Sequence, residues 1–203
     1  MSDPVALHLA GRRCVVVGGG TVATRKVRAL LAADALVVVV SPEASDDLAK
    51  LAADAVIELE LRPFAPADLD GAWLVVSATD NPEVARAVAA AEARAVFCNA
   101  AELPAVSSFT SAKVVRQGDI TVGISTAGQS PAFTSWLAER IGADLGPEYA
   151  QVCELLAELR ASLQSEGLPT DTVDWRKALD GGIVDLVRDG QMDQARELLQ
   201  TCR

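Results

Sequence analysis

The sequence lacks a long apolar run and any cluster of positive charge. No apolar stretch reaches the roughly 18 to 20 residues of a bilayer-spanning helix, and the first residues lack the ordered basic, apolar and small-residue regions of a signal peptide. These absences predict a cytoplasmic protein without membrane contact. The formal net charge is −10, whereas nonspecific nucleic-acid binding depends on clustered Lys and Arg, so we expect no nucleic-acid partner.

Cysteine and histidine, the usual ligands of a zinc site, are also scarce. Cys14, Cys98, Cys153 and Cys202 stand far apart without a C-x-x-C pair, and His8 is the one histidine. This spacing argues against both a disulfide framework and a zinc site. We therefore expect buried free thiols, interpret His8 as a packing or surface residue, and predict no metal site.

The chain contains enough apolar residues, 50% of 203, to bury a substantial core. Short valine-rich or apolar runs predict strands at residues 14–17, 36–40, 56–61, 73–78 and 95–98. Ala- and Leu-rich segments between them predict helices at residues 21–33, 44–53 and 82–93. Three of the strand runs are almost continuously apolar, which is typical of strands covered on both faces. The alternation predicts an α/β fold with a doubly wound parallel sheet.

The pattern changes after about residue 105. "FTSAKVV", the turn "RQGD" and "ITVGIST" predict a β-hairpin with Gly118 in the turn. Ser130 and Pro131 are typical of the start of a helix, which we expect to run to about Ile141. Beyond Pro147 an apolar stripe at helical spacing predicts a helical part. The sequence thus predicts three parts, at residues 1–108, 109–146 and 147–203.

The glycine turn in "VVVGGGTVATRKV" indicates a dinucleotide site. Gly18, Gly20 and Ala23 fit the pattern G-x-G-x-x-G/A directly after a predicted strand and at the start of a predicted helix. Gly18 allows the tight turn, and Gly20 lets the backbone approach a pyrophosphate at the helix N-terminus. We expect Thr21 and Val22 to contact the cofactor as well. A corner that merely needs positive φ angles is the alternative, and three glycines make it the weaker one.

The second predicted strand ends at the usual position of the ribose-binding acid. Ser41, Pro42 and Glu43 follow that strand, and no Lys or Arg is there to neutralise a 2′-phosphate. This favours NAD over NADP, although Ser41-Pro42 also fits a simple cap of the next helix. Thr79 and Asp80 end another strand and are expected to face the cofactor; Asp80 fits a strand end equally well.

One class of NAD enzyme is excluded directly. A short-chain dehydrogenase needs a catalytic Tyr with Lys four residues later, but Tyr149 is the one tyrosine and Cys153 stands at that spacing.

Four segments, in this order and spacing, resemble a known family. "GRRCVVVGGGTVATRKV", "SATDNP", "FCNAAELP" followed by "SSFTSA", and "GISTAGQSPAF" are similar to precorrin-2 dehydrogenase, the amino-terminal module of siroheme synthase. The resemblance covers about the first 145 residues well. It implies NAD-dependent oxidation of precorrin-2 to sirohydrochlorin, and a homodimer with a Rossmann domain, a dimerisation segment at residues 109–146 and a small helical domain.

The resemblance also implies roles for individual residues. The family aspartate that serves as general base is replaced here by Glu102, and Thr126 stands where the family often has serine. A solvated loop acid is the alternative interpretation of Glu102. The tetrapyrrole carries eight carboxylates, so an acidic protein needs local positive sites. The candidates are Arg25, Lys26, Lys113, Arg116 and the helix N-terminus at Ser130. For each of them, a solvated surface charge or a plain helix cap is the alternative.

The sequence is also compatible with two other functions. Some members of the family also insert ferrous iron, so a bifunctional dehydrogenase and ferrochelatase is one alternative. The replacement of aspartate by Glu102 motivates the other, a non-catalytic protein that binds NAD or a tetrapyrrole.

Overall fold

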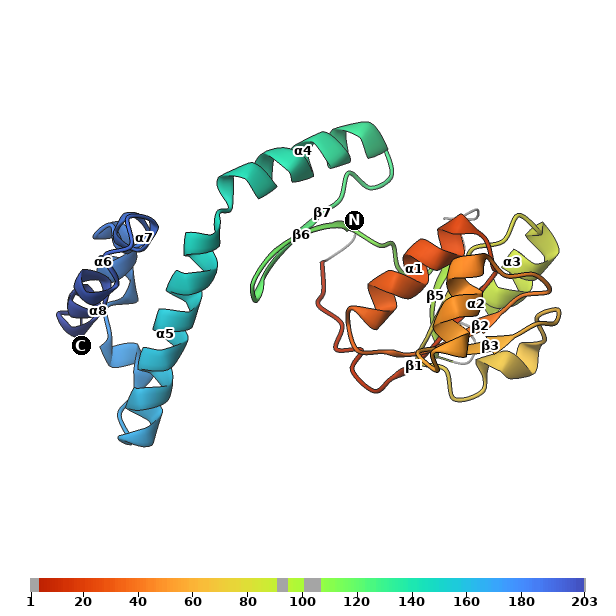
Figure 1. Cartoon of the computed structure of the whole chain (residues 1–203), viewed down its shortest axis with the longest axis horizontal. Helices are drawn as coiled ribbons and strands as arrows, with labels where there is room; N and C mark the ends of the chain where they lie inside the picture. The colour runs from red at the N-terminus through yellow and green to blue at the C-terminus, as the bar shows by residue number, and fades with distance from the viewer. Residues whose placement is uncertain (1–3, 91–94, 101–106, 203) are drawn as a thin grey trace. The chain divides into compact units, whose positions relative to one another are not determined.

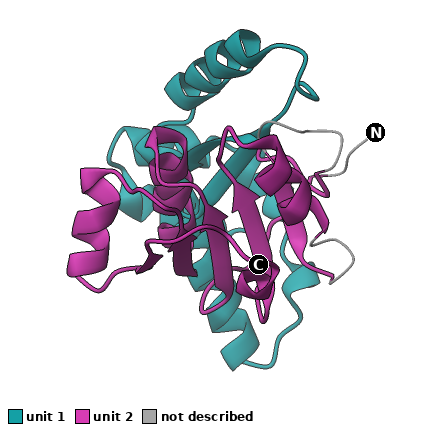
Figure 2. Ribbon diagram, turned by 90° about the vertical axis from the view of Figure 1, so that its right-hand side faces the viewer, with its two compact units in different colours: residues 1–2, 112–203 teal, residues 3–111 magenta. Residues whose placement is uncertain are grey.

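The computed structural model describes residues 4–90, 95–100 and 107–202. The chain divides into two compact units, Asp3–Ser111 and Ala112–Arg203, drawn in magenta and teal in Figure 2. The finer division into three parts remains a prediction.

The first unit is built on a five-stranded sheet in the order β3-β2-β1-β4-β5, and all neighbouring strands are parallel. Figure 1 labels β1, β2, β3 and β5 of this sheet. The strands are β1 (Arg13–Val17), β2 (Leu36–Val40), β3 (Glu58–Glu60), β4 (Leu74–Ser77) and β5 (Phe97–Ala100). The strand order reverses beside β1, between β1 and β4, which is the switch point of a Rossmann-type sheet. The α/β prediction is confirmed.

Helical elements cover both faces of this sheet. The helices α1 (Thr21–Leu31) and α2 (Asp46–Ala53) pack on one face, and the 3-10 helix η1 (Pro66–Leu69) and α3 (Pro82–Ala89) pack on the other. The strand valines alternate between the two cores: Val16, Val39 and Val76 face α1 and α2, whereas Val15, Val38 and Val75 face η1 and α3. Burial on both faces explains why these strands read as continuous apolar runs.

Some predicted boundaries were wrong by a few residues, for local reasons. The second helix begins at Asp46 because Ser45, rather than Ser41, is its N-cap and accepts a hydrogen bond from Leu48 N at 3.4 Å. The fifth strand begins at Phe97 rather than at Ala95, because Ala95 has a left-handed conformation, with φ of 58°, which does not fit a strand.

Two serine hydroxyl groups cover the outer edge of β5. Ser108 Oγ accepts from Cys98 N at 2.7 Å and donates to Cys98 O at 3.3 Å. Ser107 Oγ makes the same pair of bonds with Ala100, at 2.9 and 3.2 Å. Edge N–H and C=O groups are thereby satisfied without a sixth strand. The residues "SSF" therefore hold the chain along the sheet edge.

The second unit begins with an antiparallel hairpin of β6 (Lys113–Gln117) and β7 (Ile120–Ile124), with Gly118 in the turn at φ of 55°. The first strand of the hairpin was predicted to begin at Phe109, but it begins at Lys113, because Phe109 packs in the first unit. The next helix, α4 (Pro131–Asp144), starts at the predicted N-cap Ser130 and runs three residues beyond Ile141.

The rest of the second unit is helical. It comprises α5 (Pro147–Ser165), the 3-10 helix η4 (Thr170–Thr172), α6 (Trp175–Asp180), α7 (Ile183–Arg188) and α8 (Met192–Gln200). The predicted stripe on α5 is buried, with Val152, Leu155, Leu159 and Leu163 in one core against α7 and α8. Among the described helices, none has the length and apolar character to cross a membrane.

Candidate functional site

Three glycines join β1 to α1, and two of them are required by packing. Gly18 has φ of 120°, and a Cβ there would overlap the carbonyl oxygen of Ala78, in the connection between β4 and α3. A Cβ on Gly19 would overlap the carbonyl oxygen of Glu43, in the connection between β2 and α2. Each glycine therefore lets another loop lie directly against the turn.

At Gly20, packing against another loop does not require a glycine. Its φ of −85° is open to any residue, and a Cβ there would meet no atom of residues 4–90, 95–100 and 107–202 within 4 Å. The backbone at Gly20 thus faces open space at the carboxyl edge of the sheet, beside the switch point. A ligand group that must approach the backbone closely would explain a glycine there.

Hydrogen bonds fix the loops around this opening. Gly18 N donates to Val40 O at 3.0 Å, Ala78 N donates to Val17 O at 2.8 Å, and Ser45 N donates to Gly19 O at 2.8 Å. These bonds join the carboxyl ends of β1, β2 and β4, where open α/β sheets bind their ligands.

The N-terminus of α1 suits an anion. The helices α2, α3 and α4 are capped by the side chains of Ser45, Asn81 and Ser130, whereas α1 has Gly20 as N-cap, no capping side chain and no acidic residue in its first turn. Its first N–H groups and its positive dipole end are therefore available to a pyrophosphate. Thr21 and Val22 are exposed beside them.

The expected ribose corner lies at the same edge, but its residues differ in exposure. Ser41 is buried, and its N–H donates to Glu60 O at 3.1 Å, at the end of β3. Pro42 and Glu43 are exposed. Glu43 has its carbonyl oxygen against Gly19, and its side chain is exposed, whereas Ser41 is buried.

The end of β4 adds two hydroxyl groups. Thr79 lies beside Gly18, and its Oγ1 accepts a hydrogen bond from Asn81 N at 3.3 Å. Ser77 is 1% exposed, and its Oγ has no hydrogen-bond partner in the part of the chain that the structure describes. Asp80 is exposed. A buried hydroxyl without a partner at a strand end costs stability.

The other predicted site residues lie elsewhere or outside the described residues. Glu102, the expected base, falls outside them. Lys113, Thr126 and Ser130 belong to the second unit, where Lys113 is exposed at the start of β6. Thr126 Oγ1 accepts from Ser130 N at 3.2 Å and bonds Thr134 Oγ1 at 2.9 Å. Thr126 and Ser130 therefore also build the turn that starts α4.

Sequence reasoning missed a pair of hydroxyl groups behind the glycine turn. Thr24 Oγ1 donates to Gly20 O at 3.1 Å and lies 2.9 Å from Ser45 Oγ. The pair ties α1 to the start of α2, so it fixes the turn between them. The signal was the sequence "SDD", in which Ser45 precedes two acids, as is typical of an N-cap.

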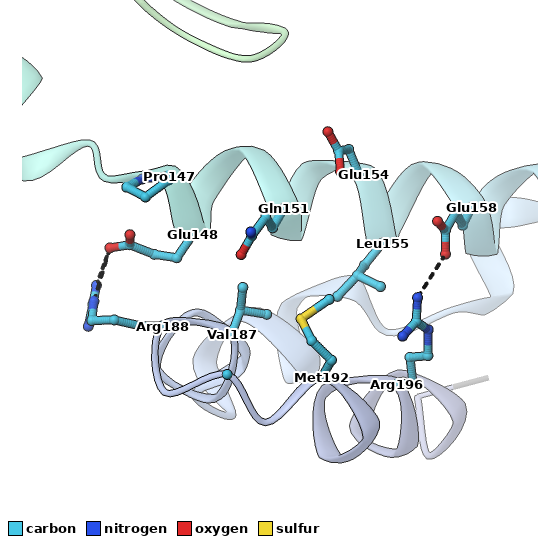
Figure 3. A pocket seen from close by; sticks show the side chains of 11 residues that line it. Pro147, Glu148, Gln151, Glu154, Leu155, Glu158, Val187, Arg188, Met192 and Arg196 are labelled. Carbon is cyan, nitrogen blue, oxygen red and sulfur yellow. Dashed lines mark hydrogen bonds and ion pairs between the residues drawn. The ribbon is translucent and has the colours of Figure 1, made fainter.

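A pocket in the second unit has the wrong charge for a dinucleotide. It lies between α5, α7 and α8, with a volume of about 580 Å³. Figure 3 shows its two arginines paired with glutamates, Arg188 with Glu148 at 2.9 Å and Arg196 with Glu158 at 3.7 Å. Glu154 adds a third carboxylate to the lining. Net negative charge disfavours phosphate groups, so the glycine turn is the better candidate.

Metal ligands and thiols give no second site. Among residues 4–90, 95–100 and 107–202, no group of three His, Cys, Asp or Glu side chains could hold a metal ion. Cys14, Cys98 and Cys202 are buried as expected, but Cys153 is exposed on α5, contrary to the prediction. Burial raises the pKa of Cys14 to about 11, so this thiol is unreactive.

Comparison with known proteins agrees with the fold and with the glycine turn. A family described as putative NAD(P)-binding matches residues 5–113. A siroheme synthase from Methylobacillus flagellatus is 36% identical over 200 residues, which cover 97% of this chain and 43% of that protein. A siroheme synthase from Chromobacterium violaceum is 35% identical over 196 residues, covering 95% of this chain and 42% of that protein.

A solved structure matches the whole chain. SirC, a precorrin-2 dehydrogenase, superposes with a TM-score of 0.72, covering 99% of this chain and 98% of its own, at 24% identity. At this identity the match shows the fold. The family resemblance predicted from the four sequence segments is confirmed, and the chain spans less than half the length of the two siroheme synthases.

Proposed function

The chain belongs to the family of putative NAD(P)-binding proteins, and from this premise we propose that it oxidises precorrin-2 to sirohydrochlorin with NAD. The observation that supports this most strongly is the match of 97% of the chain to a siroheme synthase. The similarity in fold to a precorrin-2 dehydrogenase agrees with it. The cytoplasm is the proposed compartment.

The residues at the glycine turn fit a dinucleotide. The open space at Gly20 leaves room for a pyrophosphate against the backbone, and the uncapped N-terminus of α1 supplies N–H donors. Glu43 and Ser41 would hold the adenosine ribose. The second half of the cofactor would then extend across the switch point towards Thr79, at the end of β4.

Charge at the ribose corner favours NAD over NADP. Glu43 is exposed there and would repel a 2′-phosphate. Arg62, which follows the neighbouring strand β3, already pairs with Asp68 at 2.7 Å and with Glu60 at 3.4 Å. With two carboxylates beside it, this guanidinium group has little positive charge to offer a phosphate.

Glu102 is the proposed general base of the reaction. The chemistry that bound NAD would supply is hydride acceptance, which takes up the two electrons of the oxidation. A proton must also leave the macrocycle, and the Glu102 carboxylate would accept it directly or through a water molecule. Lys113, Thr126 and Ser130 are proposed substrate contacts: Lys113 through its ammonium group, and the other two from the start of α4.

The proposed assembly is a homodimer formed by the hairpin and α4. A two-stranded hairpin is marginally stable without a covering element, and in this one the side chains are mostly half-buried or exposed. On α4, Phe133 and Trp136 stack at 5.7 Å and are each 52% exposed. Exposed aromatic side chains of this kind are typical of interface residues.

The experiment that tests the proposed function is an anaerobic assay of the purified chain with precorrin-2 and either NAD or NADP. We expect NADH formation that needs both the chain and precorrin-2, with NADP supporting a lower rate. No reduced cofactor with either nucleotide, although both ligands bind, would contradict the proposal and leave a binding protein.

A further inference from the structure

Lys26 on α1 is a cation whose contacts with the described residues are with neutral groups. Its Nζ donates to Ser111 Oγ at 3.1 Å and lies 3.5 Å from Asn99 Oδ1. Other cations of the chain pair with carboxylates, as Arg28 does with Asp47 at 2.8 Å. Among the described residues Lys26 has no carboxylate partner, although the chain has 28 acidic and 18 basic residues.

The surroundings of Lys26 make this arrangement costly. Partial burial, and then the charge of Arg25 beside it, lower the pKa of Lys26. A partly buried ammonium group without a counter-ion is destabilising, because hydroxyl and amide oxygens replace only part of its hydration. An anion at this position would remove the cost.

The contacts of Lys26 also fix where its ammonium group points. Asn99 is 7% exposed, and its Nδ2 donates to Phe109 O at 2.9 Å, which turns Oδ1 towards Lys26. An ammonium group has three N–H donors. With two directed to Ser111 and Asn99, the third is left for a ligand on the solvent side, where the contact with Ser111 is exposed.

The position of this group within the first unit suits the substrate rather than the adenosine of the cofactor. Asn99 lies one residue before the end of β5 and pairs with Val76 of β4. Val76 faces the core on the α1 side, and so do Asn99 and Lys26. The adenosine corner at Ser41–Glu43 lies on the other side of β1, across the switch point.

We propose that Lys26, held by Ser111 and Asn99, binds a carboxylate of the tetrapyrrole substrate. This inference rests on the proposed function and adds a specific contact to it. Arg25, exposed next to Lys26, increases the local positive potential in a chain whose net charge is −10. A local positive site of this kind lets an acidic protein bind a polycarboxylate.

The test uses uroporphyrin, a fluorescent porphyrin with eight carboxylates that does not reduce NAD. It is titrated into the wild-type chain and the variants Lys26→Gln and Lys26→Arg. Lys50→Gln serves as the control, because Lys50 is an exposed lysine on α2 and its loss changes the net charge equally. NAD binding and thermal unfolding are measured on every variant.

We expect Lys26→Gln to weaken uroporphyrin binding about tenfold and Lys50→Gln to weaken it less than about twofold. Lys26→Arg should restore most of the affinity because it keeps the charge. NAD affinity should not change, and the salt dependence of porphyrin binding should become shallower in Lys26→Gln alone.

The inference would be overturned if uroporphyrin bound equally well to the wild type, Lys26→Gln and Lys50→Gln. It would also be overturned if uroporphyrin bound to none of them. The inference would also be overturned if Lys26→Gln lost NAD binding and porphyrin binding together. That result would mean that Lys26 has a structural role in holding the Phe109–Ser111 segment. The proposed function is judged separately, by NADH formation from precorrin-2 with the wild-type chain.

Discussion

Gly20 is the residue at which packing gives no reason for glycine. Gly18 and Gly19 make room for the loops that lie against them, whereas Gly20 has a φ of −85° and no described residue within reach of a Cβ. The sequence pattern identified Gly18 and Gly20, but it could not show that glycine is required for packing at Gly18 and not at Gly20. This difference between the glycines depends on contacts with Ala78 and Glu43, which lie far along the chain.

Gly20→Ala should therefore weaken NAD binding without unfolding the protein. We expect the stability to stay within about 1 kcal/mol, because a poorer N-cap offsets the lower entropy of the unfolded chain. NAD affinity should fall about tenfold or more, since the methyl group would occupy the space proposed for the pyrophosphate. Isothermal titration and thermal unfolding measure both.

Gly19→Ala is the matched comparison and should behave in the opposite way. Its methyl group overlaps the carbonyl oxygen of Glu43, so the thermal midpoint should drop markedly. If Gly20→Ala and the wild type bound NAD with equal affinity, the proposed position of the pyrophosphate at Gly20 would be wrong.

Ser77 gives a second prediction at this scale. Its buried hydroxyl has no partner among the residues that the structure describes, so Ser77→Ala should raise the free energy of unfolding by about 1 kcal/mol. Ser108→Ala should lower it by a similar amount, about 1 kcal/mol, because Ser108 Oγ bonds Cys98 N at 2.7 Å. Urea unfolding compares the two; a destabilised Ser77→Ala would mean that this hydroxyl has a partner in solution.

At the scale of elements, an ion pair ties η1 to the end of β3. Asp68 is 8% exposed and accepts two hydrogen bonds from Arg62, at 3.0 and 2.7 Å, and one from Ala65 N at 2.8 Å. The hydrogen bonds from Arg62 are the largest cause that lowers the pKa of Asp68. Burial opposes this shift.

A lowered folded pKa fixes the direction of the pH dependence. Asp68 binds its proton less readily in the folded chain, so its stabilisation is present above the unfolded pKa of about 3.9 and is lost as the pH falls below it. The difference in unfolding free energy between wild type and Asp68→Asn should be present near neutral pH and shrink below about pH 4. In an Arg62→Gln background this difference should be smaller; a difference independent of both pH and Arg62 would contradict the argument.

The hairpin and α4 yield the prediction about assembly. Trp136→Glu should shift the proposed dimer towards monomer in sedimentation velocity, because it places a charge among exposed aromatic residues. Leu179→Glu, at a similarly exposed apolar residue on α6, should leave the dimer intact. The two variants sedimenting alike would place the interface elsewhere.

At the scale of the whole molecule, the fold of the first unit was predictable because local signals agree with it. Valine runs gave β1, β2 and β4, and Pro82 and Pro131 marked the starts of α3 and α4. The cap at Ser45 was missed because Ser41-Pro42 offers a competing local pattern. The role of "SSF" was hidden because its hydroxyl groups replace a strand, which periodicity does not detect.

The candidate site was less predictable, since it depends on contacts between distant segments. The glycine turn and Thr79 meet at one edge, as their positions after parallel strands predicted. Nothing in the sequence indicated that Lys26 contacts Asn99 and Ser111, 73 and 85 residues further on.

The most direct test of the central claim is an anaerobic single-turnover experiment with enzyme in excess over precorrin-2 and with NAD present. NADH fluorescence and the spectrum of the macrocycle are followed together, for the wild type and for Glu102→Gln. We predict that both signals rise in step in the wild type, and that Glu102→Gln binds both ligands but reacts at least about 100-fold more slowly. A macrocycle spectrum that stays unchanged in the wild type, with both ligands bound, would contradict the account.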